Sequence, residues 1–156
     1  MSGRAAHPGE LLLVLPAAHS VEERLRVEVR AHAVAHAVPE EELPLLEFVL
    51  SELCSNAIDH GGGEGAREES DSKDGVRFTV SFRVLGGAWA LAVSDMGGGD
   101  AELVRERLQG GDQPDVDGHR GRGLFLLAGM LDRFHVQGSR DGLGLEFTAV
   151  KRFSED

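Results

Sequence analysis

The chain has 156 residues, and its 27 acidic side chains outnumber its 16 basic ones, which gives a formal net charge of −11. This length fits one domain with a proper core, and a hydrophobic share of 41% argues against wholesale disorder. The acid excess argues against nucleic acid as the main partner, because binding phosphate backbones requires a basic face. The 21 glycines suggest backbone loops that approach a ligand closely.

The first apolar run, at residues 11–15, is stopped by Pro16 and is too short for a membrane span or a signal peptide. Cys54 is the only cysteine of the sequence, so an internal disulfide is excluded. We therefore expect a cytoplasmic protein without a membrane partner.

In the first half of the chain, the pattern predicts a strand at 11–15, a helix over 21–36 and a second helix that ends before 61–63. Ser20 and Glu23 have the spacing of a capping box, which would open the first helix. The start of the second helix stays open between Pro39 and Pro44, since both suit a first turn. Residues 62–75 predict an exposed, mobile acidic loop.

In the second half, alternation and turn residues predict strands at 76–82, 89–94, 133–137 and 143–151, and helices at 101–108 and 123–131. The glycine-, aspartate- and proline-rich stretch 109–119 predicts a flexible loop between the helices. The order of elements favours one domain over residues 1–156, with a folded core at about 11–151. The expected class is an α+β two-layer sandwich with the helices on one face of a single sheet.

Glu52 and Asn56 lie four residues apart on the second predicted helix and therefore share one face. A carboxylate and an amide aligned in this way can orient a nucleophile and coordinate a hard cation through oxygen. Taken alone, the pair is more often a polar stripe on an amphipathic helix.

Asp95 follows a nearly continuous apolar strand and precedes three glycines, Gly97–Gly99. A carboxylate at the end of a buried strand suits recognition of a ring amine, and glycines let the backbone pass close to the ligand. A plain glycine turn explains the same residues equally well.

The segment from Gly118 to Leu124 opens an apolar helix, where free backbone amides and the helix dipole favour phosphate. His119, Arg120 and Arg122 could add charge-assisted contacts. The segment is neither a Walker loop nor a Rossmann turn, and such helix starts are common without a ligand. A fourth segment, 142–145, indicates only a turn and a strand.

Together, the order and spacing of these segments resemble the N, G1, G2 and G3 boxes of the GHKL ATPase superfamily, the Bergerat fold. Within it, the chain is similar to the anti-sigma factor serine/threonine kinases of bacterial partner-switching systems. The residues that carry the resemblance are SELCSNAIDHG at 51–61, SDMGGGD at 94–100 and GRGLFLLAGMLDRF at 121–134. The resemblance extends over about 11–151 and implies a mixed, mostly antiparallel sheet with a flexible ATP lid at 100–120.

The resemblance also implies roles for individual residues. Glu52 would be the general base toward a substrate serine, Asn56 would coordinate Mg²⁺, and Asp95 would bind the adenine amine of ATP. The full set of implied cofactor-binding residues is Asn56, Asp59, His60, Asp95, Gly97, Gly99, His119, Arg120, Gly121, Arg122, Gly123, Leu124 and Thr148. Leu145 departs from the family, which usually has a threonine there, and Thr148 or a water would have to substitute for it.

The implied function is ATP- and Mg²⁺-dependent phosphorylation of a serine on an anti-anti-sigma (STAS-domain) protein, with sequestration of a sigma factor or equivalent regulator. The resemblance also implies a homodimer. An alternative, suggested by Leu145, is a nucleotide-responsive binding module with weak or no kinase activity. A histidine-kinase catalytic domain is disfavoured, because a strand and two helices account for the residues before Glu52.

Overall fold

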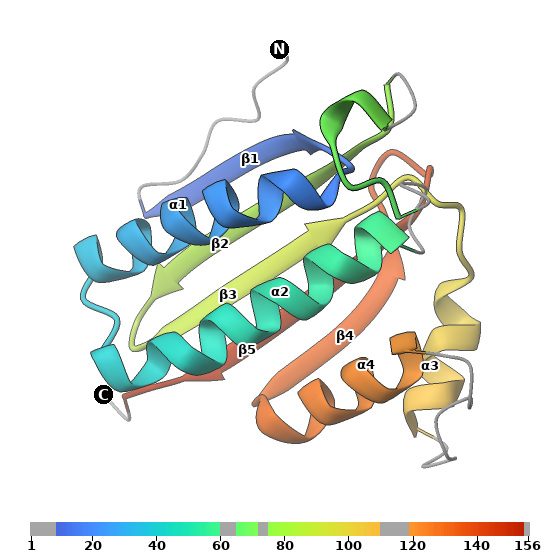
Figure 1. Ribbon diagram of the computed structural model, residues 1–156. Coiled ribbons are helices and arrows are strands. Elements are labelled where there is room, and N and C mark those ends of the chain that lie inside the picture. The colour runs from blue at the N-terminus through green and yellow to red at the C-terminus, as the bar shows by residue number, and fades with distance from the viewer. Residues whose placement is uncertain (1–8, 60–64, 72–74, 110–118, 155–156) are drawn as a thin grey trace.

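The computed structural model describes residues 9–59, 65–71, 75–109 and 119–154, which form one antiparallel sheet covered by helices (Figure 1). The strand order is β1-β2-β3-β5-β4, and every adjacent pair is antiparallel. The strands are β1 (Glu10–Pro16), β2 (Arg77–Leu85), β3 (Ala88–Ser94), β4 (Arg133–Gly138) and β5 (Leu145–Arg152). The expected mixed sheet is thus antiparallel throughout its described pairs.

The helices lie on one face of this sheet, with α2 between α1 and α4, and α3 lies at one end (Figure 1). Their bounds are α1 (Glu22–Ala35), α2 (Leu43–Asp59), α3 (Ala101–Gln109) and α4 (His119–Met130). Within the described ranges, short 3₁₀ turns are found at η1 (His19–Val21), η2 (Glu40–Glu42) and η3 (Glu69–Asp71). This arrangement confirms the predicted α+β two-layer sandwich.

The core lies between the helices and the inner face of the sheet, because alternate strand residues point toward α1 and α2. The fully buried aromatic side chains of this layer are Phe78, Phe82, Trp89 and Phe147. Leu46 and Leu53 of α2 pack against them and are completely buried. Burial of one such side chain contributes about 1.5–3 kcal/mol, so the inner face fixes the position of α2 on the sheet.

The entry into α1 differs from the predicted capping box. The chain enters the helix through η1, and the cap residue Val21 makes no side-chain cap hydrogen bond. The backbone amide of Ser20 instead donates to the carbonyl of Arg67 at 2.8 Å, and the carboxylate of Glu23 accepts from Arg26 at 3.0 Å. A contact with a distant loop therefore replaces the local cap.

The structure shows which of the two prolines begins α2. Pro39 precedes η2, and Pro44 occupies the first turn of α2, where its missing amide hydrogen costs nothing. Between the helices, Ala37 adopts a positive φ of 64°, which is the left-handed conformation that glycine favours.

The acidic loop predicted at 62–75 is not wholly exposed. Residues 62–64 and 72–74 lie outside the described part, but Ala66 is buried and its carbonyl accepts from the His19 amide at 2.8 Å. The amide of Gly65 also donates to the carbonyl of Ile58 at 2.9 Å. The described segment of this loop is therefore hydrogen-bonded to the turn before α1 and to the end of α2.

Candidate nucleotide site

The predicted site elements meet at one end of the molecule. The carboxyl end of α2, the carboxyl end of β3 and the first turn of α4 all lie at the same end of the sheet (Figure 1). The amino end of β5 joins them, since Glu146 is paired with Ser94, the last residue of β3. The antiparallel pairing thus brings segments from four parts of the sequence together.

Asp95 is held by the backbone at this end of the sheet. Its side chain is buried, and its Oδ1 accepts hydrogen bonds from the amides of Gly97 at 2.9 Å and Leu145 at 3.2 Å. A Cβ on Gly144 would overlap the Asp95 carboxylate, so only glycine fits beside it. The carboxylate therefore has one fixed orientation, as a recognition group for a ring amine requires.

Leu145 fills the space beneath the glycine turn. It is buried, and its Cδ1 lies 2.8 Å from where a Cβ on Gly99 would stand. Thr148 does not take over the family's threonine position. It is paired opposite Ala92 and His135 on the face of the sheet that lies away from the helices, which separates it from Asp95.

Glu52 and Gly123 meet between α2 and α4. A Cβ on Gly123 would overlap Oε2 of Glu52 and would lie 3.2 Å from its carboxyl carbon, so the carboxylate rests directly on the α4 backbone. Gly121 is the third residue of α4, so its amide is among the first amides of the helix, which lack helical acceptors and attract anions, and Gly123 follows as the fifth residue. A carboxylate that can accept a proton is thus placed beside amides that can bind phosphate.

The remaining predicted residues divide into four groups. Asn56 is buried on α2, one turn after Glu52, as predicted. Asp59 bonds to His19, and Leu124 is buried in the core, so these two side chains serve the fold as described. His60 lies outside the described residues. For His119, Arg120 and Arg122 the backbone is helical and only that is described.

The predicted lid at 100–120 includes α3, and residues 110–118 lie outside the described part.

The sequence reasoning missed His19, which joins three elements near the site. Its Nε2 lies 2.8 Å from Asp59 Oδ1 and its Nδ1 lies 3.0 Å from Glu22 Oε2. Burial opposes protonation, but the hydrogen bonds and negative charges of Asp59 and Glu22 outweigh it, so the pKa of His19 is raised. Because Asp59 is 40 residues away, no local pattern signals this contact.

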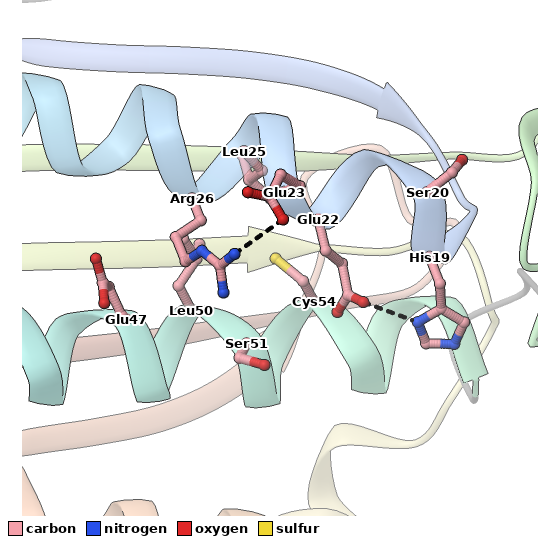
Figure 2. Close-up of a pocket in the computed structure, with 10 residues that line it drawn as sticks. All are labelled: His19, Ser20, Glu22, Glu23, Leu25, Arg26, Glu47, Leu50, Ser51 and Cys54. Carbon is pink, nitrogen blue, oxygen red and sulfur yellow. Dashed lines mark hydrogen bonds and ion pairs between the residues drawn. The ribbon is translucent and has the colours of Figure 1, made fainter.

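A cavity of about 360 Å³ lies between α1 and α2 (Figure 2). Cys54 points into it from α2, and Arg26 and Glu23 form an ion pair at its α1 side. Burial, together with the charge of Glu22, raises the pKa of the Cys54 thiol well above its usual value. Glu52 faces α4 rather than α1, so this cavity is separate from the site at Asp95 and Gly123.

The donor set fits Mg²⁺ held chiefly by phosphates. Among the described residues there is no group of three or more His, Cys, Asp and Glu side chains that could hold a metal alone. Mg²⁺ commonly keeps waters and takes one or two protein oxygens together with substrate phosphates, a role that the Asn56 amide oxygen suits. None of the helices within the described ranges is sufficiently long and apolar to cross a membrane.

The chain matches the histidine kinase-like ATPase domain family over residues 15–149. It therefore belongs to this family, and the superfamily predicted from the motifs is confirmed. Among solved structures it resembles a chain in the crystal structure of the SiaB–SiaC complex from Pseudomonas aeruginosa. That match has a TM-score of 0.65 and 17% identity, and covers 90% of this chain and 88% of the other. No curated protein sequence matches it.

Proposed function

We propose that the protein is an ATP-dependent serine kinase of the anti-sigma type. It would phosphorylate a serine of an anti-anti-sigma (STAS-domain) protein and sequester a sigma factor or equivalent regulator. The observation that carries this proposal is the contact between Glu52 and Gly123. It sets a carboxylate that can accept a proton next to the first turn of α4, whose free backbone amides can bind phosphate.

Each residue of the site then has a separable task. Glu52 accepts the serine hydroxyl proton as the serine oxygen bonds to the γ-phosphorus and the bond to the β-phosphate oxygen breaks, leaving ADP. Asp95 accepts a hydrogen bond from the adenine amine. The free amides of the first turn of α4, including that of Gly121, would receive phosphate charge, and Gly123 leaves room for Glu52 beside them. Asn56 would hold Mg²⁺, which neutralises that charge.

The assembly expected for this function has two parts. The likeness to a chain of a two-protein complex supports a partner protein as the substrate. The family resemblance adds a homodimer as the kinase's own state. Phosphorylation would add about two negative charges to the antagonist at the interface and so release it.

The test is phosphate transfer in a lysate of the native cells. Purified wild-type protein with γ-labelled ATP and Mg²⁺ should label a serine of a STAS-domain protein, identified by mass spectrometry. Glu52→Gln should bind ATP but reduce transfer by about 100-fold or more, as loss of a general base does. Ser51→Ala, an exposed neighbour on the same helix, is the matched control and should transfer normally. Full transfer by Glu52→Gln would refute the base assignment.

The second candidate is a nucleotide-responsive binding module with weak or no kinase activity. Leu145 favours it, because an apolar side chain packs beneath Gly99 where a hydroxyl could have bonded. Calorimetry combined with the transfer assay separates the two candidates. Wild-type protein that binds ATP and Mg²⁺ and yet labels no serine would be the module, whereas binding with transfer is the kinase.

A further inference from the structure

The outer face of the sheet is not covered by any described element. All the helices over the strands lie on the other side (Figure 1). The outward positions are those that alternate with the buried ones, and they form rows across the strands. One such row, from the pairings, runs Glu10, Arg83, Ala90, Val150, Arg133.

Arginines concentrate on this face. The outward strand positions hold Arg77, Arg83, Arg133 and Arg152, and Arg140 from the turn after β4 lines the same cavity as Arg83. We call these five residues the arginine face. Glu10 and Glu146 are the outward carboxylates of the strands, and Asp141 follows Arg140 in its turn, so the charge of these groups is five minus three, or +2, in a chain of −11.

The part of the helical layer formed by α1 and α2 has the opposite charge. Residues 22–59, which span α1 and α2, contain nine acidic and three basic side chains, a net of −6. The molecule therefore separates its charge between two faces, although its total is strongly negative. A basic face that persists on an acidic protein selects acidic partners and repels basic ones.

The arginines of the arginine face form no ion pairs with other described residues. The ion pairs found among the described residues use Arg24, Arg26, Arg30, Lys151 and His19. Glu10 accepts from Ser81, while Glu146 accepts from Ser94 and Gln137. Within the described ranges, no ion pair uses a guanidinium group of the arginine face, so these groups are available to a ligand.

The centre of the face is hollow. Ala90 and Ala92 of β3 line a cavity of about 90 Å³, together with Arg83 and Arg140, the hydroxyl side chains of Ser81 and Thr148, and one carboxylate, Glu146, which accepts from Ser94 and Gln137. Small side chains on the central strand let a partner chain approach the sheet. Guanidinium and hydroxyl donors around it match carboxylate oxygens.

We propose that the arginine face is a docking surface for an acidic segment of a partner protein, with one carboxylate seated in the cavity between Arg83 and Arg140. It lies on the opposite side of the sheet from Glu52, so it would act independently of the nucleotide site. A partner held there leaves the proposed kinase site open, which would allow two proteins to be bound at once.

The test uses a fluorescent poly-glutamate peptide as the probe, with poly-lysine as the charge-reversed control. Fluorescence anisotropy should show binding of poly-glutamate, despite the net charge of the chain, that weakens with salt. Arg83→Ala/Arg140→Ala should bind it about fivefold or more weakly, as expected for the loss of two charge-assisted contacts. Arg24→Ala/Arg26→Ala removes the same charge from α1 and should change the affinity by less than about twofold.

Other outcomes would overturn the proposal. It fails if poly-glutamate does not bind, or if both double variants bind it equally. It also fails if saturating ATP and Mg²⁺ displace the peptide, which would place the peptide in the nucleotide site. Tighter binding of a single-stranded RNA of equal charge would assign the face to nucleic acid. A wild-type dimer that Arg83→Ala/Arg140→Ala dissociates in sedimentation would assign it to a second copy. Thermal unfolding of each variant confirms that it is folded.

Discussion

The backbone amide of Leu145 donates a hydrogen bond to Oδ1 of Asp95 at 3.2 Å. A backbone group thus fixes the carboxylate expected to recognise adenine, whatever side chain stands at position 145. The missing threonine hydroxyl matters less to Asp95 than the family pattern suggests, because Gly97 supplies the second amide. Position 145 serves the fold through its side chain and the site through its backbone.

Leu145→Thr should therefore separate stability from binding. Replacing a buried leucine with a smaller polar residue should lower the free energy of unfolding by about 2–4 kcal/mol. The ATP affinity should change by less than about threefold, because the amide bond to Asp95 remains. Urea unfolding and calorimetry measure the two effects. Leu143→Thr, at an exposed site, is the control and should change neither; a large loss of ATP affinity in Leu145→Thr alone would contradict this division.

Gly123→Ala should disable phosphate transfer without unfolding the protein. The new methyl group would overlap the Glu52 carboxylate and displace it from the first turns of α4. We expect transfer to fall by about tenfold or more, since misplacing a catalytic group is costly. Gly129→Ala, in the same helix with nothing within 4 Å, should keep full transfer and gain about 0.5–1 kcal/mol of stability. Equal transfer by both variants would show that the contact is unimportant.

The contacts of His19 should make stability depend on pH. Its folded pKa is raised above the ordinary value of 6.5, so protonation favours the folded state. This contribution is fully present below pH 6.5 and is lost as the pH rises through the raised folded pKa. The difference in unfolding free energy between wild type and His19→Gln should accordingly shrink from about pH 5 to pH 8. His135→Gln, exposed on β4, is the control; a constant difference for His19→Gln would rule out the linkage.

Ala37→Gly should stabilise the protein. Ala37 has a φ of 64° after the end of α1, and the amide of Val38 returns to the carbonyl of Ala33 at 3.0 Å, as in a helix end that prefers glycine. Glycine removes the strain on Cβ, and we expect a gain of about 0.5–1 kcal/mol in urea unfolding. Ala35→Gly, two residues earlier at the end of α1, should lose a similar amount. A loss in Ala37→Gly would contradict the strain argument.

Sequence periodicity was sufficient to predict the strands and the site helix. Phe78, Val80 and Phe82 alternate toward the core, and Glu52 and Asn56 share a face of α2, because both patterns are local. The same rule excludes Thr148 from the site. Leu145 and Thr148 are three residues apart in one strand and must point to opposite faces, so the substitution of one for the other could have been rejected from the sequence.

The errors of prediction arose where distant segments meet. Ser20 and Glu23 have the spacing of a local cap, yet the Ser20 amide bonds to Arg67 across the fold. The polar composition of 62–75 predicts exposure, but a single alanine, Ala66, anchors its described part. Such contacts depend on how α1 and α2 are placed on the sheet, which propensity does not encode.

The division of charge between the helical layer and the arginine face gives the protein an electric dipole perpendicular to its sheet. An acidic protein that approaches at random meets a repulsive monopole at long range and this dipole at close range. The dipole would orient the two proteins so that the arginine face points toward the acidic partner before any side chains touch. Raising the salt concentration would therefore slow the association with an acidic partner less than it slows that with a basic one, because salt also screens the opposing net charge.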